Sequence, residues 1–570
     1  MKHYSLRKSR KIHTLVSERE EKKRGKLTNP QQKEIEKTLN ELSHALKEKD
    51  KEQASLHAKE AELFYEKHYK KTPLEWFGEF TIAITIALVA AVIIRLMWFE
   101  LYEIPTGSMR PTYKESDRLA VTKTQFGINI PLLTKHFYFD PDLVKRTGVI
   151  IFTADGLPKT DTDTRYFYIF PSKKRFVKRL LGKPGDSLYF YGGKIYGVDK
   201  DGNPIDELLN APWMETIDNI PFITFWGGEP EFTNEGIEIS QYNMPVGRIA
   251  FTPMGKPTGK IFNGKQWIDD KPTAKPHDSI QTYSDLFGMK NFATAKIIEN
   301  EGKHLLELTH TPSLKDPKFQ GQNLALNLQT TTLPLDKVHL KRILDNLVTE
   351  RFTVVKGKAH SWGHRLSTYS PDFPGIPDGT YEFDKGKAYW IDFTGWRHPL
   401  PADHPLYNQS PENIVRLYNF GVVFHKLAAY LYRYSYFRDG DLYLMGAPIF
   451  KKGEPVLEKF VEAEKKKELP FIDWGKPESL EMITTFGLKI PEKSYLMLGD
   501  NYPVSQDSRV FGFVPEQNIE GRPSINLWPP GNRWGFIMQS PYEIFVLPRL
   551  LIWAIVLGAL CIWYVLFRKK

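Results

Sequence analysis

The stretch EIPTGSMRPT, residues 103–112, begins a few residues after an apolar run that ends at Phe99. Proline fixes its own φ and pushes the preceding residue towards extended geometry, so the two prolines predict a short extended segment. Ser108 follows a glycine in this segment, which leaves its hydroxyl open to a peptide lying alongside. On this stretch alone, however, the pattern favours an ordinary turn residue at Ser108.

Two further stretches bear on Ser108, namely FVKRLLGKPGD at residues 176–186 and GDNYPVSQDSR at residues 499–509. A nucleophilic serine needs a group that takes its proton, and no histidine lies in a recognisable triad setting. Lysine is the other option, although its ordinary pKa of about 10.4 keeps it protonated unless burial lowers that value. Lys178 lies in an alternating run, so it is either walled off by apolar neighbours or a surface lysine of a strand.

Taken together, the three stretches resemble the sequence boxes of bacterial type I signal peptidases. These are membrane-bound Ser/Lys endopeptidases that remove signal peptides from exported proteins. Residues 104–112 resemble the nucleophile box, residues 176–186 the base box, and residues 499–509 the third box. The order of the boxes and their position after an apolar segment also agree with that family.

The resemblance implies a catalytic role for four residues. Ser108 is expected to be the acylated nucleophile and Lys178 its general base. Thr106 is expected to place its hydroxyl in the oxyanion hole beside the Ser108 backbone N–H, where such donors stabilise the transition state by a few kcal/mol. Ser505 is expected to hydrogen-bond the Lys178 amine and orient it.

The resemblance also implies a substrate and its binding site. Asp507 and Arg509 are expected to form an ion pair that shapes the third stretch. Four residues are expected to line pockets for the small side chains at positions −1 and −3 of a signal peptide: Ile104, Met109, Phe176 and Val177. The partners are then exported preproteins and the lipid bilayer, with no nucleic acid, cofactor or metal expected.

Several features depart from the family pattern. Thr106 stands where serine is usual, Ser116-Asp117 replaces the usual Gly-Asp, and Tyr502-Pro503 replaces a usually polar pair. The gap between Lys178 and the third stretch is far longer than the family needs. None of these departures removes a reacting group.

The net charge of +10 is concentrated at the N-terminus, where residues 1–26 hold ten Lys or Arg against three acidic residues. This basic segment is either a nucleic-acid or anionic-lipid arm or a cytoplasmic tail that orients a membrane segment. Residues 27–72 are predicted to be helical, with an apolar seam at Ile35, Leu39, Leu42 and Leu46. That seam is typical of a short coiled coil, a partner-binding helix or a helix that covers little.

Two apolar runs, at residues 74–99 and 550–567, are predicted to span the membrane. The alternative for the second run is a buried core helix. Basic residues at both ends of the chain place both termini in the cytoplasm under the positive-inside rule. The resemblance then puts the chain in a bacterial cytoplasmic membrane, with its catalytic part outside the cytoplasm.

The predicted fold class is mainly β, with a signal-peptidase-like core, a large insertion, two transmembrane helices and an N-terminal charged helical region. Strands are expected at 149–152, 166–170 and 176–181, and hairpins around Gly192-Gly193 and around residues 384–386. Helices are expected near 336–348 and 411–431. The predicted domains are 1–73 (cytoplasmic), 74–99 (transmembrane), 100–196 (core, first part), 197–490 (β-rich insertion), 491–545 (core, second part) and 546–570 (transmembrane with basic tail).

Three functions are open at this point. The first is a signal peptidase that cuts exported preproteins at the outer face of the membrane. The second is a membrane-anchored scaffold with a degenerate peptidase core, whose insertion binds partners. The third is a Ser/Lys autopeptidase with one dedicated substrate.

Overall fold

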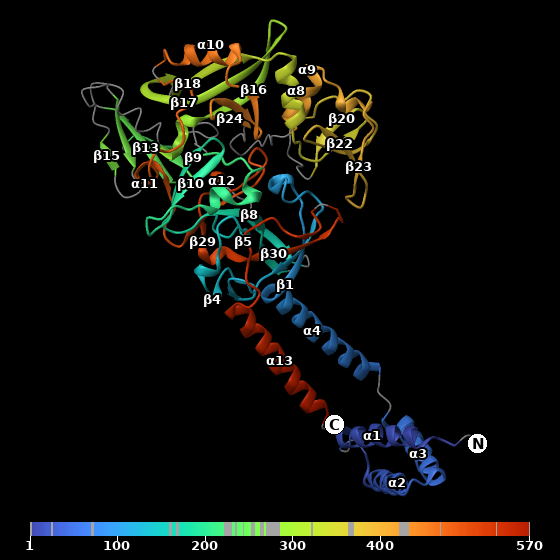
Figure 1. Ribbon diagram of the computed structural model, residues 1–570. Coiled ribbons are helices and arrows are strands. Elements are labelled where there is room, and N and C mark those ends of the chain that lie inside the picture. The colour runs from blue at the N-terminus through green and yellow to red at the C-terminus, as the bar shows by residue number, and fades with distance from the viewer. Residues whose placement is uncertain are drawn as a thin grey trace. The chain divides into compact units, whose positions relative to one another are not determined.

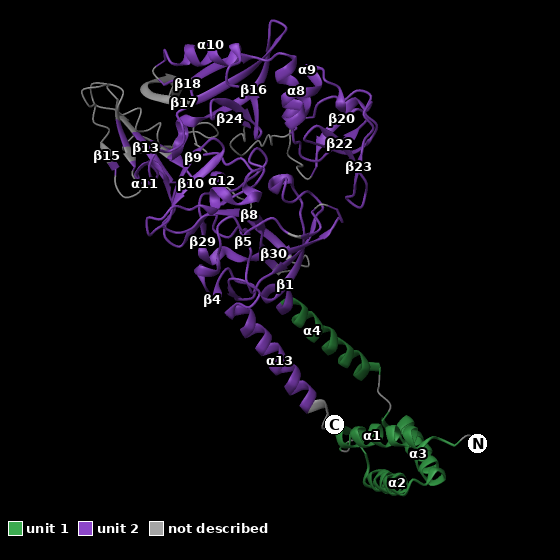
Figure 2. Ribbon diagram, in the orientation of Figure 1, with its two compact units in different colours: residues 1–92 green, residues 93–570 purple. Residues whose placement is uncertain are grey.

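The computed structural model divides the chain into two compact units, residues 1–92 and 93–570 (Figure 2). The boundary between the units falls inside a long apolar helix. The structure describes residues 3–23, 25, 27–69, 73–158, 162–166, 170–221, 231–233, 236–242, 244–251, 257–262, 267–269, 286–320, 323–362, 370–420, 433–467, 469–531 and 533–568.

Helices form the first unit. They are α1 (Leu6–Lys23), α2 (Asn29–Glu48) and α3 (Lys51–Phe64), followed by a π turn at Tyr65–Tyr69. The helical prediction for residues 27–72 is confirmed over α2, α3 and the π turn, and residues 70–72 lie outside the described residues. Lys49 has a φ of 59° and ends α2, and the Asp50 carboxylate accepts the backbone N–H groups of Glu52 and Gln53 at the start of α3.

The apolar seam of α2 is covered within the first unit. Ile35 and Leu42 are fully buried, and Leu39 and Leu46 pack against the same cluster. The other buried members come from α1, α3 and the π turn: Ile12, Val16, Ala54, Ala58, Ala61, Phe64 and Tyr69. The seam therefore packs inside this chain.

Among the residues that the structure describes, two helices are long and apolar enough to cross a membrane, at Pro73–Met97 (α4) and Leu547–Val565, which lies within α13 (Leu547–Arg568). In α13, Ile555, Leu557 and Ile562 are each more than 60% exposed. Because exposed apolar surface costs about 25 cal/mol per Å² in water, such a helix needs an apolar surrounding. The alternative of a buried core helix is therefore wrong.

A central antiparallel sheet in the second unit carries the three stretches. Its order is β1-β2-β30-β5-β8-β28-β29, and β31 pairs with β30. The strands are β1 (Phe99–Glu103), β2 (Arg118–Thr122), β5 (Val149–Thr153), β8 (Arg175–Gly182), β28 (Ser494–Leu498), β29 (Val514–Pro515), β30 (Ile519–Trp528) and β31 (Gly535–Phe536). The register places Ile150 opposite Lys178, and Leu498 opposite Arg179. Segments that flank the insertion thus lie on neighbouring strands.

Two of the three predicted strands are confirmed, as β5 and β8. The prediction of one strand over residues 166–170 is wrong. Tyr166 ends β6 (Asp163–Tyr166), Phe170 begins β7 (Phe170–Lys173), and the two residues pair across a hairpin. An aromatic run gives the same pattern whether it is continuous or folded back, because aromatic residues also pair across strands.

Both predicted hairpins are confirmed. β9 (Ser187–Tyr191) and β10 (Lys194–Val198) are joined by Gly192 and Gly193, whose φ angles of 60° and 73° suit glycine. β21 (Gly379–Asp384) and β22 (Lys387–Ile391) are joined by Lys385 and Gly386, which also have positive φ.

The insertion is built from three further antiparallel sheets and several helices. Their orders are β11-β12-β13-β14-β15, β18-β17-β16-β24-β25-β26 and β20-β19-β21-β22-β23. The strands not yet given are β11 (Glu231–Thr233), β12 (Gly236–Gln241), β13 (Met244–Phe251), β14 (Pro257–Phe262), β15 (Trp267–Asp269), β16 (Phe292–Asn300), β17 (Lys303–Gln320), β18 (Asn323–Pro334), β19 (Phe352–Val355), β20 (Lys358–Ser361), β23 (Arg397–Pro399), β24 (Arg433–Arg438), β25 (Asp441–Leu444) and β26 (Ala447–Phe450).

The described helices of the insertion include α8 (Lys337–Asn346), α9 (Pro411–Asn419), α10 (Pro455–Glu464) and α11 (Leu480–Phe486). The predicted helix near 336–348 is confirmed as α8. The one predicted over 411–431 is confirmed as far as Asn419, and residues 421–431 lie outside the described residues.

The insertion and the central sheet share a hydrophobic core. One buried cluster contains Leu181 of β8, Phe292 of β16, Tyr434 of β24 and Leu496 of β28. The last strand of the insertion, β27 (Leu488–Lys489), pairs with β9. In Figure 1, the six-stranded sheet lies at the end of the second unit opposite to the end from which α13 leaves. The insertion therefore packs as part of the second unit.

Candidate active site

Ser108 lies in a short 3₁₀ turn, Gly107–Met109, which is separated from the end of β1 by residues 104–106. Its side chain is about nine-tenths buried. The turn is closed by the Arg110 backbone N–H, which donates to the Gly107 carbonyl over 3.1 Å. The prediction of an extended entry agrees with Thr106, which has φ −138° and ψ 159°.

Asn501 holds the serine turn from the third stretch. Its backbone N–H donates to the Ser108 carbonyl over 3.1 Å, and its Nδ2 donates to the Gly107 carbonyl over 3.0 Å. A Cβ on Gly499 would lie 2.6 Å from the Ser108 carbonyl oxygen, so only glycine allows this approach. Sequence analysis did not assign Asn501 this role, although it lies within a quoted stretch.

Lys178 reaches Ser108 from β8. Its Nζ donates to Ser108 Oγ over 2.8 Å, and the residue is only 3% exposed. Burial lowers the pKa of Lys178 to about 8, although the Asp507 carboxylate acts to raise it. A lysine with that pKa is partly neutral near pH 8 and can accept a proton from the hydroxyl that it contacts.

The apolar surroundings of Lys178 come from its position in the strand. Phe176 is on the same side of β8, with its ring centroid 5.7 Å from Lys178 Nζ. Phe176 in turn packs on Phe152 of β5 and on Phe511, with ring centroids 5.9 Å and 5.6 Å away. These rings exclude water from the lysine stem and account for the loss of solvation.

An ion pair beneath the site organises the third stretch. Arg509 Nε and Nη2 donate to the two Asp507 carboxylate oxygens over 2.8 Å and 2.6 Å. Asp507 Oδ2 also accepts the Gly499 backbone N–H over 2.8 Å. Burial raises the pKa of Asp507, but Arg509, the Gly499 N–H and the Ser505 hydroxyl lower it by more, so the carboxyl is held ionised.

A second buried ion pair joins the base strand to the third stretch. Arg179 donates to both oxygens of the Asp500 carboxylate, over 2.7 Å and 2.8 Å, and the Thr112 hydroxyl donates to the same carboxylate. No sequence pattern predicts this pair. Its only signal was the position of Arg179 and Asp500 inside two of the quoted stretches.

Ser505 is fully buried next to the serine turn. Its Oγ is so close to Gly499 that a Cβ there would lie 2.1 Å away. No hydrogen bond joins Ser505 to the Lys178 amine among the described residues, which differs from the expected role. The Ser505 hydroxyl instead helps to lower the pKa of the Asp507 carboxyl.

The predicted pocket residues divide between two faces of the sheet. Ile104 and Met109 are 4% and 1% exposed and share a cluster, against which Val177 packs. Phe176 belongs to the cluster on the other face, with Phe152. Side chains alternate along β8, so Phe176 lies on the same face as Lys178. It therefore points away from the other three predicted pocket residues, which are Ile104, Met109 and Val177.

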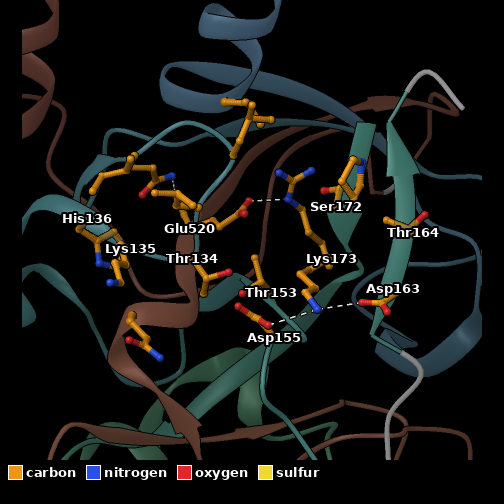
Figure 3. Close-up of a pocket in the computed structure, with 18 of the residues that line it drawn as sticks. Thr134, Lys135, His136, Thr153, Asp155, Asp163, Thr164, Ser172, Lys173 and Glu520 are labelled. Carbon is orange, nitrogen blue, oxygen red and sulfur yellow. Dashed lines mark hydrogen bonds and ion pairs between the residues drawn. The ribbon is translucent and has the colours of Figure 1, made fainter. Parts of the chain in front are cut away.

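A separate cavity of about 750 Å³ lies away from Ser108 and Lys178 (Figure 3). Its charged groups are largely paired. Lys173 lies 3.4 Å from Asp155 and 2.8 Å from Asp163, and the Arg175 side chain lies 2.5 Å from Glu520. Neither member of the Ser108–Lys178 pair lines this cavity. Within the described ranges, no group of three or more His, Cys, Asp or Glu is arranged to hold a metal ion.

Sequence comparisons find similarity to one family of proteins. The sequence model of the family described as signal peptidase, peptidase S26, matches residues 77–226 and 436–528. Signal peptidase I of Leptolyngbya laminosa is 35% identical over 96 residues, which are 17% of this chain and 39% of that protein. Signal peptidase I of Rickettsia typhi is 33% identical, and that of Rickettsia conorii 32% identical, over 140 residues, which are 23% of this chain and 45% of each relative. The chain spans less than half the length of these curated relatives.

Proposed function

We propose that this chain is a membrane-bound serine endopeptidase, because residues 77–226 and 436–528 match the sequence model of the signal peptidase S26 family. Its proposed substrates are exported preproteins, from which it removes the N-terminal signal peptide. The observation that carries the proposal is the 2.8 Å contact between Lys178 Nζ and Ser108 Oγ. A buried lysine with a lowered pKa beside a serine hydroxyl is suited to general-base catalysis.

Acylation begins when neutral Lys178 takes the proton from Ser108 Oγ. The oxygen attacks the carbonyl carbon of the scissile peptide bond, and the carbonyl oxygen becomes an oxyanion. The Ser108 backbone N–H and the Thr106 hydroxyl are the proposed donors to that oxyanion. The Lys178 ammonium then gives its proton to the leaving amine of the mature protein, which leaves an ester between Ser108 and the signal peptide.

Deacylation reverses the roles. Neutral Lys178 takes a proton from a water molecule, and the resulting oxygen attacks the ester carbonyl. The proton returns through Lys178 to Ser108 Oγ as the signal peptide leaves as a free acid. These proton transfers require that the base and the nucleophile stay in place relative to each other. β8 pairs with β28, which directly precedes the third stretch, and Asn501 of the third stretch hydrogen-bonds the serine turn.

Substrate recognition is proposed to use the cluster of Ile104, Met109 and Val177. These apolar side chains lie beside the serine turn and suit small residues at positions −1 and −3. An extended signal peptide is proposed to add main-chain hydrogen bonds to the strands beside the site.

The two candidate membrane helices support an extracytoplasmic site. Lys and Arg are concentrated in residues 1–26 and again in residues 568–570. Under the positive-inside rule both ends lie in the cytoplasm, and the residues between α4 and α13 lie outside. The proposed location is the bacterial cytoplasmic membrane.

Cleavage of a model preprotein by the purified full chain in detergent tests the proposal. Wild type is expected to release the mature protein, with its new N-terminus directly after a small residue. Ser108→Ala is expected to lower the rate by at least ~10³-fold, because the nucleophile is removed. N-terminal sequencing and the initial rate are the measurements.

Lys183→Ala is the matched control, because Lys183 lies in the same stretch as Lys178 but donates to the Pro141 carbonyl away from the site. Its rate is expected to equal that of wild type. Failure of wild type to cut any of several unrelated preproteins would contradict the proposal. That result would favour the scaffold or an autopeptidase with a dedicated substrate.

A further inference from the structure

A buried ionic cluster joins the serine-bearing segment to the insertion. We call it the Glu382 cluster. Its members on the segment that follows Ser108 are Arg110, Lys114 and Glu115, and its members on the insertion are Arg351, Glu382, Asp384 and Arg397. The two groups lie more than two hundred residues apart in the sequence and meet only in the folded chain.

Glu382 contacts cations from both sides of the cluster. Its side chain is fully buried in β21. One oxygen accepts from Arg110 Nη2 over 2.6 Å, and the other accepts from Lys114 Nζ over 3.0 Å. Arg397 Nε lies 2.5 Å from the second oxygen. Burial acts to raise the pKa of Glu382, but these cations hold it well below its ordinary value.

Arg110 transmits this contact to the serine turn. Its Nε donates to Glu115 over 2.9 Å, and a Cβ on Gly107 would lie 2.7 Å from the Glu115 carboxylate. The ion pair therefore packs against the residue that precedes Ser108. The Arg110 backbone N–H closes the turn by donating to the Gly107 carbonyl.

The insertion also touches this segment at two neighbouring points. The Arg351 backbone N–H donates to Glu115 over 3.0 Å, and Arg351 Nη1 donates to the Ser116 hydroxyl over 3.2 Å. Because the Arg110 side chain is only 1% exposed, water cannot replace a lost carboxylate. Removal of one partner from such a buried pair forces the other to move or to stay uncompensated.

We propose that Glu382, supplied by the insertion, is a positioning residue that fixes Arg110 and thereby holds the Ser108 turn in reach of Lys178. This inference rests on the proposed peptidase function. Glu382 itself touches neither Ser108 nor Lys178, so it acts through Arg110. A displacement of about 1 Å at a reacting group can cost about 10²-fold in rate, so a distant anchor has a measurable effect.

Glu382→Gln in the full chain tests the proposal, because glutamine keeps the shape of the side chain and removes its charge. We expect kcat for a signal-peptide substrate to fall by at least ~10-fold, with KM within about twofold of wild type. We also expect amide hydrogen exchange of residues 107–113 to become at least ~10-fold faster, as the turn opens more often.

Asp345→Asn is the matched control. Asp345 lies on α8 of the insertion and forms an exposed ion pair with Lys341 over 2.6 Å. Such pairs contribute little to stability, so kcat and the exchange of residues 107–113 should stay at wild-type values. Wild-type kcat and wild-type exchange in Glu382→Gln would overturn the proposal, as would an effect confined to KM.

Glu382→Asp keeps the test decisive if Glu382→Gln does not fold. Aspartate retains the charge but withdraws it by one methylene, so kcat should fall below that of wild type, by less than the ~10-fold expected for loss of the charge. Equal kcat and equal exchange in Glu382→Asp and wild type would then overturn the proposal. If wild type itself cleaves no preprotein, the proposed function fails, and the exchange measurement alone decides whether Glu382 holds the turn.

Discussion

Two buried lysines flank the serine turn, and they differ in what their ammonium groups face. Lys178 contacts the Ser108 hydroxyl over 2.8 Å and forms no ion pair within the part of the chain that the structure describes. Lys114 lies 3.0 Å from Glu382 and 2.6 Å from Asp384. Both lysines are 3% exposed, so burial alone does not distinguish them.

The two lysines differ in whether carboxylates pair directly with the buried ammonium group. Burial lowers the pKa of both, but at Lys114 the Glu382 and Asp384 carboxylates oppose the shift. At Lys178 the opposing carboxylates are Asp507 and Asp500, which are already bound by Arg509 and Arg179, and the pKa falls to about 8. A compensated buried cation holds the structure together, whereas an uncompensated one beside a hydroxyl is free to exchange a proton.

The largest effect expected from this comparison is on activity at Lys178. Lys178→Met keeps the length and apolar character of the side chain and removes the amine. Cleavage of a preprotein should fall by at least ~10²-fold, because no base remains beside Ser108. The thermal unfolding temperature should stay the same or rise, since a poorly solvated cation is removed. Near-wild-type cleavage would show that the base is another group.

The same substitution at Lys114 is expected to act on stability instead. Lys114→Met leaves Glu382 and Asp384 with fewer cations, and should lower the free energy of unfolding of the second unit by about 3 kcal/mol. Urea unfolding followed by tryptophan fluorescence measures this change. The loss of kcat should be much smaller than in Lys178→Met. Unchanged stability would mean that the remaining arginines compensate the two carboxylates without Lys114.

Much of the candidate site could be predicted because its groups lie inside three short stretches. Ser108 and Lys178 were identified from those stretches, and the strand that carries Lys178 follows from local alternation. The same alternation places Phe176 on the face of Lys178. Phe176 and Val177 therefore point to opposite faces and cannot line the same pocket, as was expected of them. The boundaries of helices and strands depend on local backbone geometry that composition does not reveal. One example is the end of α2 at Lys49, and another is the pairing of Tyr166 with Phe170 on two different strands.

The role of the insertion could not be predicted in the same way. A charge pair such as Arg110–Glu382 leaves no periodic pattern, because its members meet only after the sheets have formed. Arg110 lies in the stretch that carries Ser108 and Glu382 beside the hairpin turn at residues 384–386, and no sequence pattern links the two positions. The Arg179–Asp500 pair could not be predicted from the sequence either, although Arg179 follows Lys178 and Asp500 lies in the third stretch.

The pH dependence of kcat/KM for a signal-peptide substrate tests the central claim most directly, because it reports the ionisation of the free enzyme. Lys178 must be neutral to act as a base, so activity should rise with pH. With a pKa of about 8, kcat/KM should increase about tenfold between pH 7 and pH 9, with half of the maximum near pH 8. A profile that is flat from pH 6 to pH 9, or one that is still rising steeply at pH 10, would contradict the account.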